Sequence, residues 1–162
     1  MEIMNDSTHR RPRPALSFYH ANGKGTGSAL TVALEKATAD CDGRLLVGLA
    51  PQESDAAFPR FDWPREVCVS LGVVDVCLLL QVLRGETESV ADGKGLYIVR
   101  DGNRIRLCFR HMVEPINGYS LEVYALLSGG EERRVGIVLS SAEALGLCAA
   151  VEGGMAAMCF GA

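Results

Sequence analysis

The hydrophobic pattern of residues 66–84 changes within one segment from that of a strand to that of a helix. Residues 67–71 alternate between apolar and small or polar side chains, which is typical of a strand with one buried face. Residues 73–83 are then almost all apolar, which predicts a helix that is covered on more than one side. Asp75 stands where its carboxylate can accept from the free N–H groups of a first helical turn, and Gly85 can end the helix.

The same succession returns near the C-terminal end of the sequence. Residues 135–139 are typical of a strand, and Ser140 and Glu143 have the spacing of a capping box, in which each side chain accepts from the backbone N–H of the other residue. A second apolar segment over residues 145–158 predicts a second helix. A strand-to-helix unit that occurs twice indicates two halves with one shared architecture.

Further strands precede each of these units. Their apolar and polar residues alternate, and Asp101-Gly102-Asn103 is a typical hairpin turn between two of them. The predicted strands cover residues 16–21, 28–35 and 44–49 in the first half, and residues 96–100, 104–111 and 119–127 in the second. The sequence therefore predicts an α+β protein in which four strands and a helix occur twice.

The composition of the 162 residues is that of a folded domain, with 48% hydrophobic and 22% charged residues. We expect a single domain over residues 15–162, with halves at 15–85 and 95–162, after a flexible basic arm over residues 1–14. The arm is either a solvated tail or an accessory phosphate contact. No apolar run has the length of a membrane span and the N-terminus lacks a signal-peptide core, so we expect a cytoplasmic protein without membrane contact.

The sequence predicts neither a metal site, nor a cofactor site, nor a catalytic centre, and we expect no enzyme. The cysteines lack metal or redox spacing, and their apolar surroundings favour small buried side chains in a reducing compartment. His20 and His111 lie in separate halves without a surrounding motif, and only Cys108 has cationic neighbours that favour a thiolate. The six cysteines are Cys41, Cys68, Cys77, Cys108, Cys148 and Cys159.

Three segments of the chain resemble the whirly family of single-stranded nucleic-acid-binding proteins. Residues 24–32 are similar to the family's KGKAAL-Ser-Val segment, although its second lysine is absent here. Residues 61–63 (Phe-Asp-Trp) are similar to its Tyr-Asp-Trp before the fourth strand, and residues 138–160 resemble its last strand and its Ser- or Thr-capped helix. Relatives of the family include the PUR-alpha proteins and the mitochondrial guide-RNA-binding proteins.

This resemblance implies a fold, an assembly and a ligand. The fold would be two four-stranded antiparallel sheets with the helices packed between them. The assembly would be a homotetramer whose sheets form nucleic-acid-binding edges between protomers, and the ligand would be single-stranded DNA or RNA. Helices too apolar to be exposed independently predict a homo-oligomer, either a dimer or a tetramer.

Cationic and aromatic side chains on outward strand faces are the candidate ligand contacts. A protein that binds single strands needs cations along a groove and flat side chains on which bases stack. Arg104, Arg106 and Arg110 share one face of a predicted strand, while Tyr19 points away from the apolar face of its own strand. The candidate nucleic-acid contacts are Tyr19, Lys24, Arg44, Trp63, Arg100, Arg104, Arg106, Arg110 and Tyr119.

Each candidate also has a structural explanation. The arginines could form a solvated sheet face that pairs with Glu86, Glu88 or Glu122. Trp63 could belong to the core or cover a helix, and Tyr19 could be an exposed ring without a ligand.

Together these patterns predict a protein that binds single-stranded nucleic acid, above all DNA, with the role in transcription regulation or DNA maintenance that the resemblance implies. The alternative is a homo-oligomeric interaction or scaffold protein with the same fold and no nucleic-acid binding. The formal net charge of −4 favours this alternative, because an acidic protein repels polyanions unless it carries a local basic patch.

Overall fold

Eight strands and two α-helices make up the computed structural model of the chain, which describes residues 14–54 and 58–162. The first half contains β1 (Ala15–His20), β2 (Ser28–Glu35), β3 (Arg44–Pro51), a short 3-10 helix η1 (Trp63–Arg65), β4 (Val67–Leu71) and α1 (Val73–Leu83). The second half contains a short 3-10 segment η2 (Val90–Gly93), β5 (Leu96–Arg100), β6 (Asn103–Met112), β7 (Gly118–Leu126), β8 (Glu132–Ser140) and α2 (Ser141–Phe160). The predicted basic arm lies outside the described residues apart from Pro14.

The strands form two antiparallel four-stranded sheets with simple meander topology. The first sheet has the order β1-β2-β3-β4 and the second has the order β5-β6-β7-β8. Each sheet is followed in the sequence by one helix, so the predicted α+β architecture is confirmed.

Local chemistry explains where the two helices begin and end. The backbone N–H of Gly72 donates to the Asp75 carboxylate at 3.4 Å at the start of α1, and Gly85 follows its end with a φ of 75°. At the start of α2, the N–H of Glu143 donates to the Ser140 hydroxyl at 3.1 Å, and the N–H of Ser140 donates to the Glu143 carboxylate at 3.0 Å. Both predicted helix starts are therefore confirmed, the second as a complete capping box.

The predicted hairpin turn between β5 and β6 is also confirmed. Asp101 has a φ of 53° and Gly102 has a φ of 77°. Two consecutive positive φ angles are the mark of a type I′ turn, whose twist matches that of the flanking strands. This turn fixes the pairing of β5 with β6.

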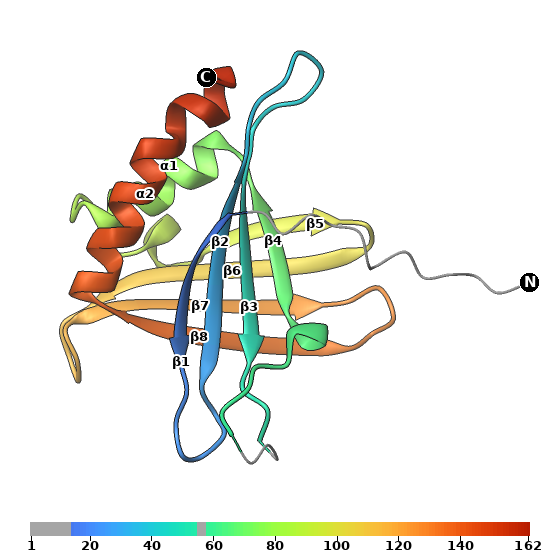
Figure 1. Cartoon of the computed structure of the whole chain (residues 1–162), viewed down its shortest axis with the longest axis vertical. Coiled ribbons are helices and arrows are strands. Elements are labelled where there is room, and N and C mark those ends of the chain that lie inside the picture. Colours follow the sequence, from blue (N-terminus) through green and yellow to red (C-terminus); the bar gives the residue numbers. More distant parts are fainter. Residues whose placement is uncertain (1–13, 55–57) are drawn as a thin grey trace, which may run out of the picture.

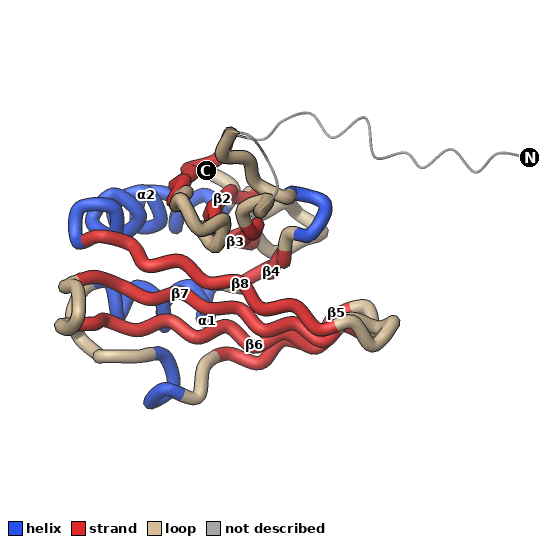
Figure 2. The backbone as a smooth tube through the Cα atoms, turned by 90° about the horizontal axis from the view of Figure 1, so that it is seen from below, coloured by secondary structure: helices blue, strands red, loops and turns tan. Residues whose placement is uncertain are grey.

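The two sheets enclose one hydrophobic core. Their strands cross steeply, and the two helices lie together at one end, where each contacts strands of both sheets (Figures 1 and 2). The core is continuous across the halves, since alternate residues of every inner strand point into it. Its fully buried members include Leu30 and Leu49 from the first sheet, Leu107 and Leu139 from the second, and Met158 from α2.

Two polar contacts join β8 to the first half, one to β2 and one to the residue that precedes β4. The Ser28 hydroxyl of β2 donates to the Gly136 carbonyl of β8 at 2.6 Å, and the Arg133 guanidinium donates to the Glu66 carbonyl at 3.3 Å. Ser28 is buried, so its hydrogen bond satisfies a hydroxyl that water cannot reach. The strand β8 therefore lies against the first sheet.

The cysteines are less buried than the sequence predicted. Four of them are exposed and two are half-buried, so the interpretation as small buried side chains is wrong for the single chain. The reason is their direction, because Cys68 lies on the outward face of β4 and Cys77 on the solvent side of α1. All six are free thiols; Cys41 and Cys159 are exposed as well, and Cys108 and Cys148 are half-buried.

The helices are also less covered than their composition suggests. Val74 on α1 is 73% exposed, although the sequence predicts that this helix is covered on more than one side. The helix α2 is long and apolar enough to span a membrane by length and composition, which corrects the expectation that no run reaches that length. Here it packs on the sheets through Leu147, Val151 and Met158.

Candidate nucleic-acid interface

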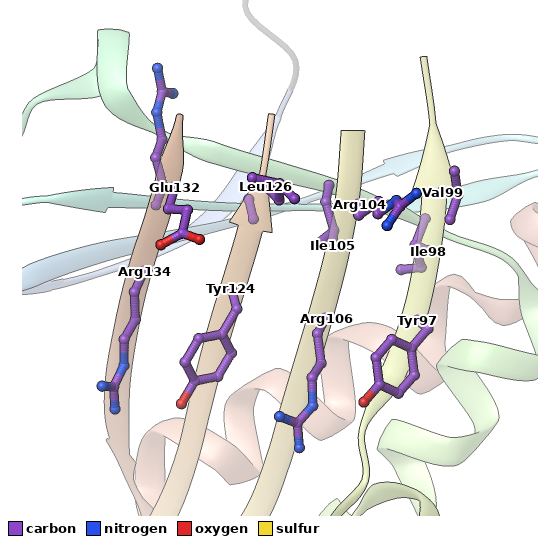
Figure 3. Close-up of a pocket in the computed structure, with 12 residues that line it drawn as sticks. Tyr97, Ile98, Val99, Arg104, Ile105, Arg106, Tyr124, Leu126, Glu132 and Arg134 are labelled. Carbon is purple, nitrogen blue, oxygen red and sulfur yellow. The ribbon is translucent and has the colours of Figure 1, made fainter. Parts of the chain in front are cut away.

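Four aromatic and cationic side chains form a row across the outer face of the second sheet. Tyr97 of β5 lies opposite Arg106 of β6, Arg106 lies opposite Tyr124 of β7, and Tyr124 lies opposite Arg134 of β8. Directly paired residues of antiparallel strands point to the same side of a sheet. We call these four residues the Tyr–Arg row; their side chains lie next to one another in Figure 3.

The rings and guanidinium groups of the Tyr–Arg row are in contact. The Cζ of Arg106 lies 5.8 Å from the ring centroid of Tyr97 and 5.8 Å from that of Tyr124. The Cζ of Arg134 lies 5.1 Å from the Tyr124 centroid. These are cation–π distances, so each guanidinium is held by a neighbouring ring.

Backbone carbonyls hold the central cation of the row in place. The Nε of Arg106 donates to the Lys94 carbonyl at 2.9 Å, and Nη2 donates to the Gly93 carbonyl at 3.4 Å. Neither partner carries a negative charge. Arg106 therefore has a fixed geometry and keeps its full positive charge for a ligand.

The Tyr–Arg row lines a hollow of about 740 Å³. The neighbouring row on the same face, Val99, Arg104, Leu126 and Glu132, forms another part of its wall. Tyr97 and Val99 are 73% and 74% exposed. The hollow therefore offers apolar surface and cations together, which is the combination that nucleotide bases and phosphates require.

A carboxylate stands beside the row and organises one end of it. The Tyr124 hydroxyl donates to Oε2 of Glu122, and the Arg134 Nη2 donates to the same oxygen at 3.2 Å. The hydrogen bond from Tyr124, together with the charge of Arg134, holds the pKa of Glu122 below its usual value. The same hydrogen bond raises the pKa of Tyr124. Glu122 is thus an anion that orients a ring and a cation of the row.

The structure brings the three predicted arginines of β6 to one face. Arg104, Arg106 and Arg110 all point outward, and the first two line the hollow. Arg104 and Arg110 form no ion pair with any residue in the described ranges. The structural explanation, in which carboxylates engage these arginines, is therefore not met for Arg104. Arg110 forms no ion pair there, but its positive charge helps to lower the pKa of Glu122. Arg100 lies at the tip of the β5–β6 hairpin, 4.0 Å from the Asp101 carboxylate.

Four other candidates lie in the first half, away from the Tyr–Arg row. Tyr19 is 60% exposed on β1, and its ring lies 5.7 Å from that of Phe61. Lys24 is exposed in the turn between β1 and β2. Arg44 donates from Nε to the Ser70 hydroxyl at 2.6 Å and so holds β3 to β4, and Trp63 is half-buried in η1.

Tyr119, the last candidate, lies on the inner face of the second sheet. Its ring stacks on Phe109 at a centroid distance of 5.8 Å, and the His111 ring lies 4.9 Å away. Phe109 is buried in the core. Tyr119 is therefore packed against the core and does not share the face of the three arginines.

Three members of the Tyr–Arg row were not among the candidates from the sequence, namely Tyr97, Tyr124 and Arg134. A signal for each was present, because Tyr97 and Tyr124 alternate with buried neighbours and Arg134 precedes the buried Val135. Alternation places a residue outward but does not say which residue of the next strand it meets.

Within residues 14–54 and 58–162, no group of His, Cys, Asp and Glu side chains could hold a metal ion.

Comparisons with known proteins identify the fold. No protein-family model matches the sequence, and no curated protein matches it. Among solved structures, the chain has the fold of the Whirly proteins, as the sequence resemblance predicted. WHY1 from Arabidopsis thaliana superimposes with a TM-score of 0.71 at 19% sequence identity, over 93% of this chain and 87% of that one.

Two further structures share the fold at lower scores. The plant transcriptional regulator PBF-2 has a TM-score of 0.67 and 18% identity, over 91% of this chain and 84% of its own. The trypanosome MRP1/MRP2 structure has a TM-score of 0.64 and 16% identity, over 90% of this chain and 86% of that chain. At these identities the likeness establishes the fold alone.

Proposed function

We propose that the protein binds single-stranded nucleic acid across the outer face of its second sheet. The observation that carries this proposal is the Tyr–Arg row, in which two rings and two guanidinium groups alternate over four neighbouring strands. Rings provide platforms for bases, each worth about 1–3 kcal/mol, and guanidinium groups neutralise phosphates. Arg104 and Arg110, which form no ion pair with another described residue, extend the cationic surface on either side.

The ligand is single-stranded because the platforms act on the faces of bases. In a duplex those faces are stacked inside the helix, and only the base edges and the backbone are accessible. Single-stranded DNA is the ligand class we favour, with a role in transcription regulation, since the fold is shared with the plant transcriptional regulator PBF-2.

Self-association is the second part of the proposal. Apolar side chains stay exposed on both helices, with Val74 on α1 73% exposed, and Leu145 and Phe160 on α2 72% and 83% exposed. The two helices lie together at one end of the molecule (Figure 1), and exposed apolar residues on neighbouring helices favour a protein interface there. A single mass corresponding to one chain, measured by light scattering at micromolar concentration, would contradict this part.

Fluorescence anisotropy with labelled single-stranded and duplex oligonucleotides tests the ligand. We expect binding to single strands that weakens between about 50 and 200 mM salt, because bound phosphates release counterions. Arg106→Glu should weaken binding and reduce the salt slope by roughly 0.7, the value for one lost phosphate contact on a single strand. Arg60→Glu, an exposed site paired with Glu53 in the first half, makes the same charge change and is the matched control.

Two outcomes would count against the proposal. Equal losses in the Arg106 and Arg60 variants would mean that net charge governs binding rather than the Tyr–Arg row. Absence of binding at the lower salt would favour the interaction-protein alternative, with which the net charge of −4 agrees.

A further inference from the structure

The carboxylate of Glu122 is only partly used by the protein. Both of its hydrogen bonds, from Tyr124 and Arg134, go to Oε2. Within the described part of the chain no hydrogen bond reaches Oε1, and about a third of the side chain (31%) is exposed. An ionised carboxylate has about four acceptor positions. Two of them therefore remain open to a ligand.

Space is kept open around this carboxylate. Its cross-strand partner on β8 is Gly136, where an added Cβ would lie 3.1 Å from the Cγ of Glu122. Its partner on β6 is the small side chain of Cys108. The next row of the sheet therefore contains one anion between two small residues, directly beside the rings and cations of the Tyr–Arg row.

Two hollows meet at Glu122. One has a volume of about 360 Å³ and is lined by Tyr124, Arg134 and Arg110 among others. The other, of about 300 Å³, extends along β8 past Gly136. A base stacked on the Tyr124 ring or on the Arg134 guanidinium would project its edge into this space and meet the free acceptor positions.

The chemistry of those positions distinguishes the bases. An ionised carboxylate accepts hydrogen bonds and cannot donate, so it favours base edges with N–H donors. Guanine presents two adjacent donors on its Watson–Crick edge, the N1–H and the 2-amino group. Cytosine and adenine present one amino group each, and thymine or uracil presents one N–H between two carbonyl oxygens that a carboxylate repels.

We propose that Glu122 is a base-selecting residue, and that it gives the site a preference for guanine over thymine or uracil in a single strand. This preference rests on the proposed function, because it needs a base stacked on the Tyr–Arg row. The neighbouring cations Arg134 and Arg110 offset the repulsion between the carboxylate and the phosphates of the same strand. Glu122 thus sets which base is held, while the row supplies most of the affinity.

Competition between defined oligonucleotides tests the selection. The three probes are a thymidine oligomer, the same oligomer with isolated guanines that cannot form quadruplexes, and a third in which inosine replaces guanine and so lacks the 2-amino group. We expect the full-length protein to bind the guanine oligomer roughly tenfold more tightly than the thymidine oligomer. The inosine oligomer should lie between the two.

Substitutions test whether the Glu122 carboxylate selects the base. Glu122→Gln should bring the ratio of guanine to thymidine affinities to about one, because an amide both donates and accepts. Glu53→Gln, which removes a carboxylate paired with Arg60 in the first half, is the matched control and should retain the preference.

Each possible result decides between the two proposals. Equal affinities of the unaltered protein for guanine and thymidine oligomers would overturn the selection but leave single-strand binding intact. A preference that persists in Glu122→Gln, or that disappears in Glu53→Gln, would also overturn it. If no oligomer binds at low salt, the proposed function fails and the selection fails with it.

Discussion

The two sheets have the same topology, but their outer surfaces carry different kinds of side chain. On the first sheet, small residues face outward in register, as in the row formed by Thr31, Gly48 and Cys68. On the second sheet, the corresponding surface carries the Tyr–Arg row and a hollow of about 740 Å³. The outer face of the first sheet therefore has small residues at its centre, with Tyr19 and the Glu35–Arg44 pair toward its margins. The outer face of the second sheet has rings, cations and carboxylates within contact of one another.

The inner faces of the two sheets are alike. Leu49 at the centre of the first sheet and Leu107 at the centre of the second are both fully buried in one core. The shared architecture thus depends on the inward residues alone. Because outward residues contribute little to that core, they could diverge between the halves without changing the fold. Ligand binding is accordingly expected on one sheet only.

The largest expected effect tests the likeness of the inner faces. Leu49→Ala and Leu107→Ala should each lower the free energy of unfolding by about 2–5 kcal/mol, since both leave a cavity in a closely packed core. Urea denaturation followed by circular dichroism measures both losses. A loss in one half that is several-fold smaller than in the other would mean that the two sheets do not share one cooperative core.

The next effect tests the difference between the outer faces. Tyr97→Ala should weaken single-strand binding by about 1–3 kcal/mol, the usual loss when a stacking ring is removed. Tyr19→Ala removes an exposed ring from the first sheet and should change binding by less than about 0.5 kcal/mol, as ordinary surface substitutions do. Anisotropy titrations with the same oligonucleotide measure both.

Equal losses in these two variants would break the comparison. They would mean that the ligand extends over both sheets, and that Tyr19 and Phe61 form a second platform on the first. A loss with Tyr19→Ala alone would move the site to the first sheet and leave the Tyr–Arg row with a structural role.

The smallest expected effect is on the stability of the fold at acidic pH. Burial alone would raise the pKa of Glu143, but hydrogen bonds from Ser140 and His20 lower it overall, and the Arg133 hydrogen bond lowers the pKa of Glu131. The pKa of such a carboxyl group is about 4.5 in the unfolded chain and lower in the folded protein. The ionised group therefore stabilises the folded protein at pH values above about 4.5, and this stabilisation is lost as the pH falls through the lower, folded-state pKa. Both groups, and Glu122, lie in the second half.

We therefore expect the free energy of unfolding to decrease as the pH is lowered through the range below about 4.5, and the decrease to be shallower in Glu143→Gln. Urea denaturation at a series of pH values measures it. Identical pH profiles for the variant and the unaltered protein would show that the capping box of α2 makes no contribution to the acid sensitivity of the second half.

Much of the fold could be predicted because local signals and the global structure agree. The spacing of Ser140 and Glu143 predicted a capping box that is present, and Asp101-Gly102 predicted a turn that forms. The exposure of Cys77 could not be predicted, because an apolar residue on an apolar helix carries no information about which side meets the core.

The candidate site was predicted only in part for a related reason. Alternation placed Arg104, Arg106 and Arg110 outward correctly. The same alternation places Tyr119 on the apolar face with Leu121 and Val123, and there its ring stacks on Phe109. Whether an aromatic ring is a platform or a part of the core depends on what covers it in three dimensions.

The sequence by itself determined the elements, their inward faces and the ends of both helices, because alternation, capping and turn chemistry act over a few neighbouring residues. The tertiary structure alone decided that Tyr97, Arg106, Tyr124 and Arg134 stand in one row. Their alignment depends on the register of four strands, and a shift of two residues in any pair would keep every side chain on its face while separating the rings from the cations.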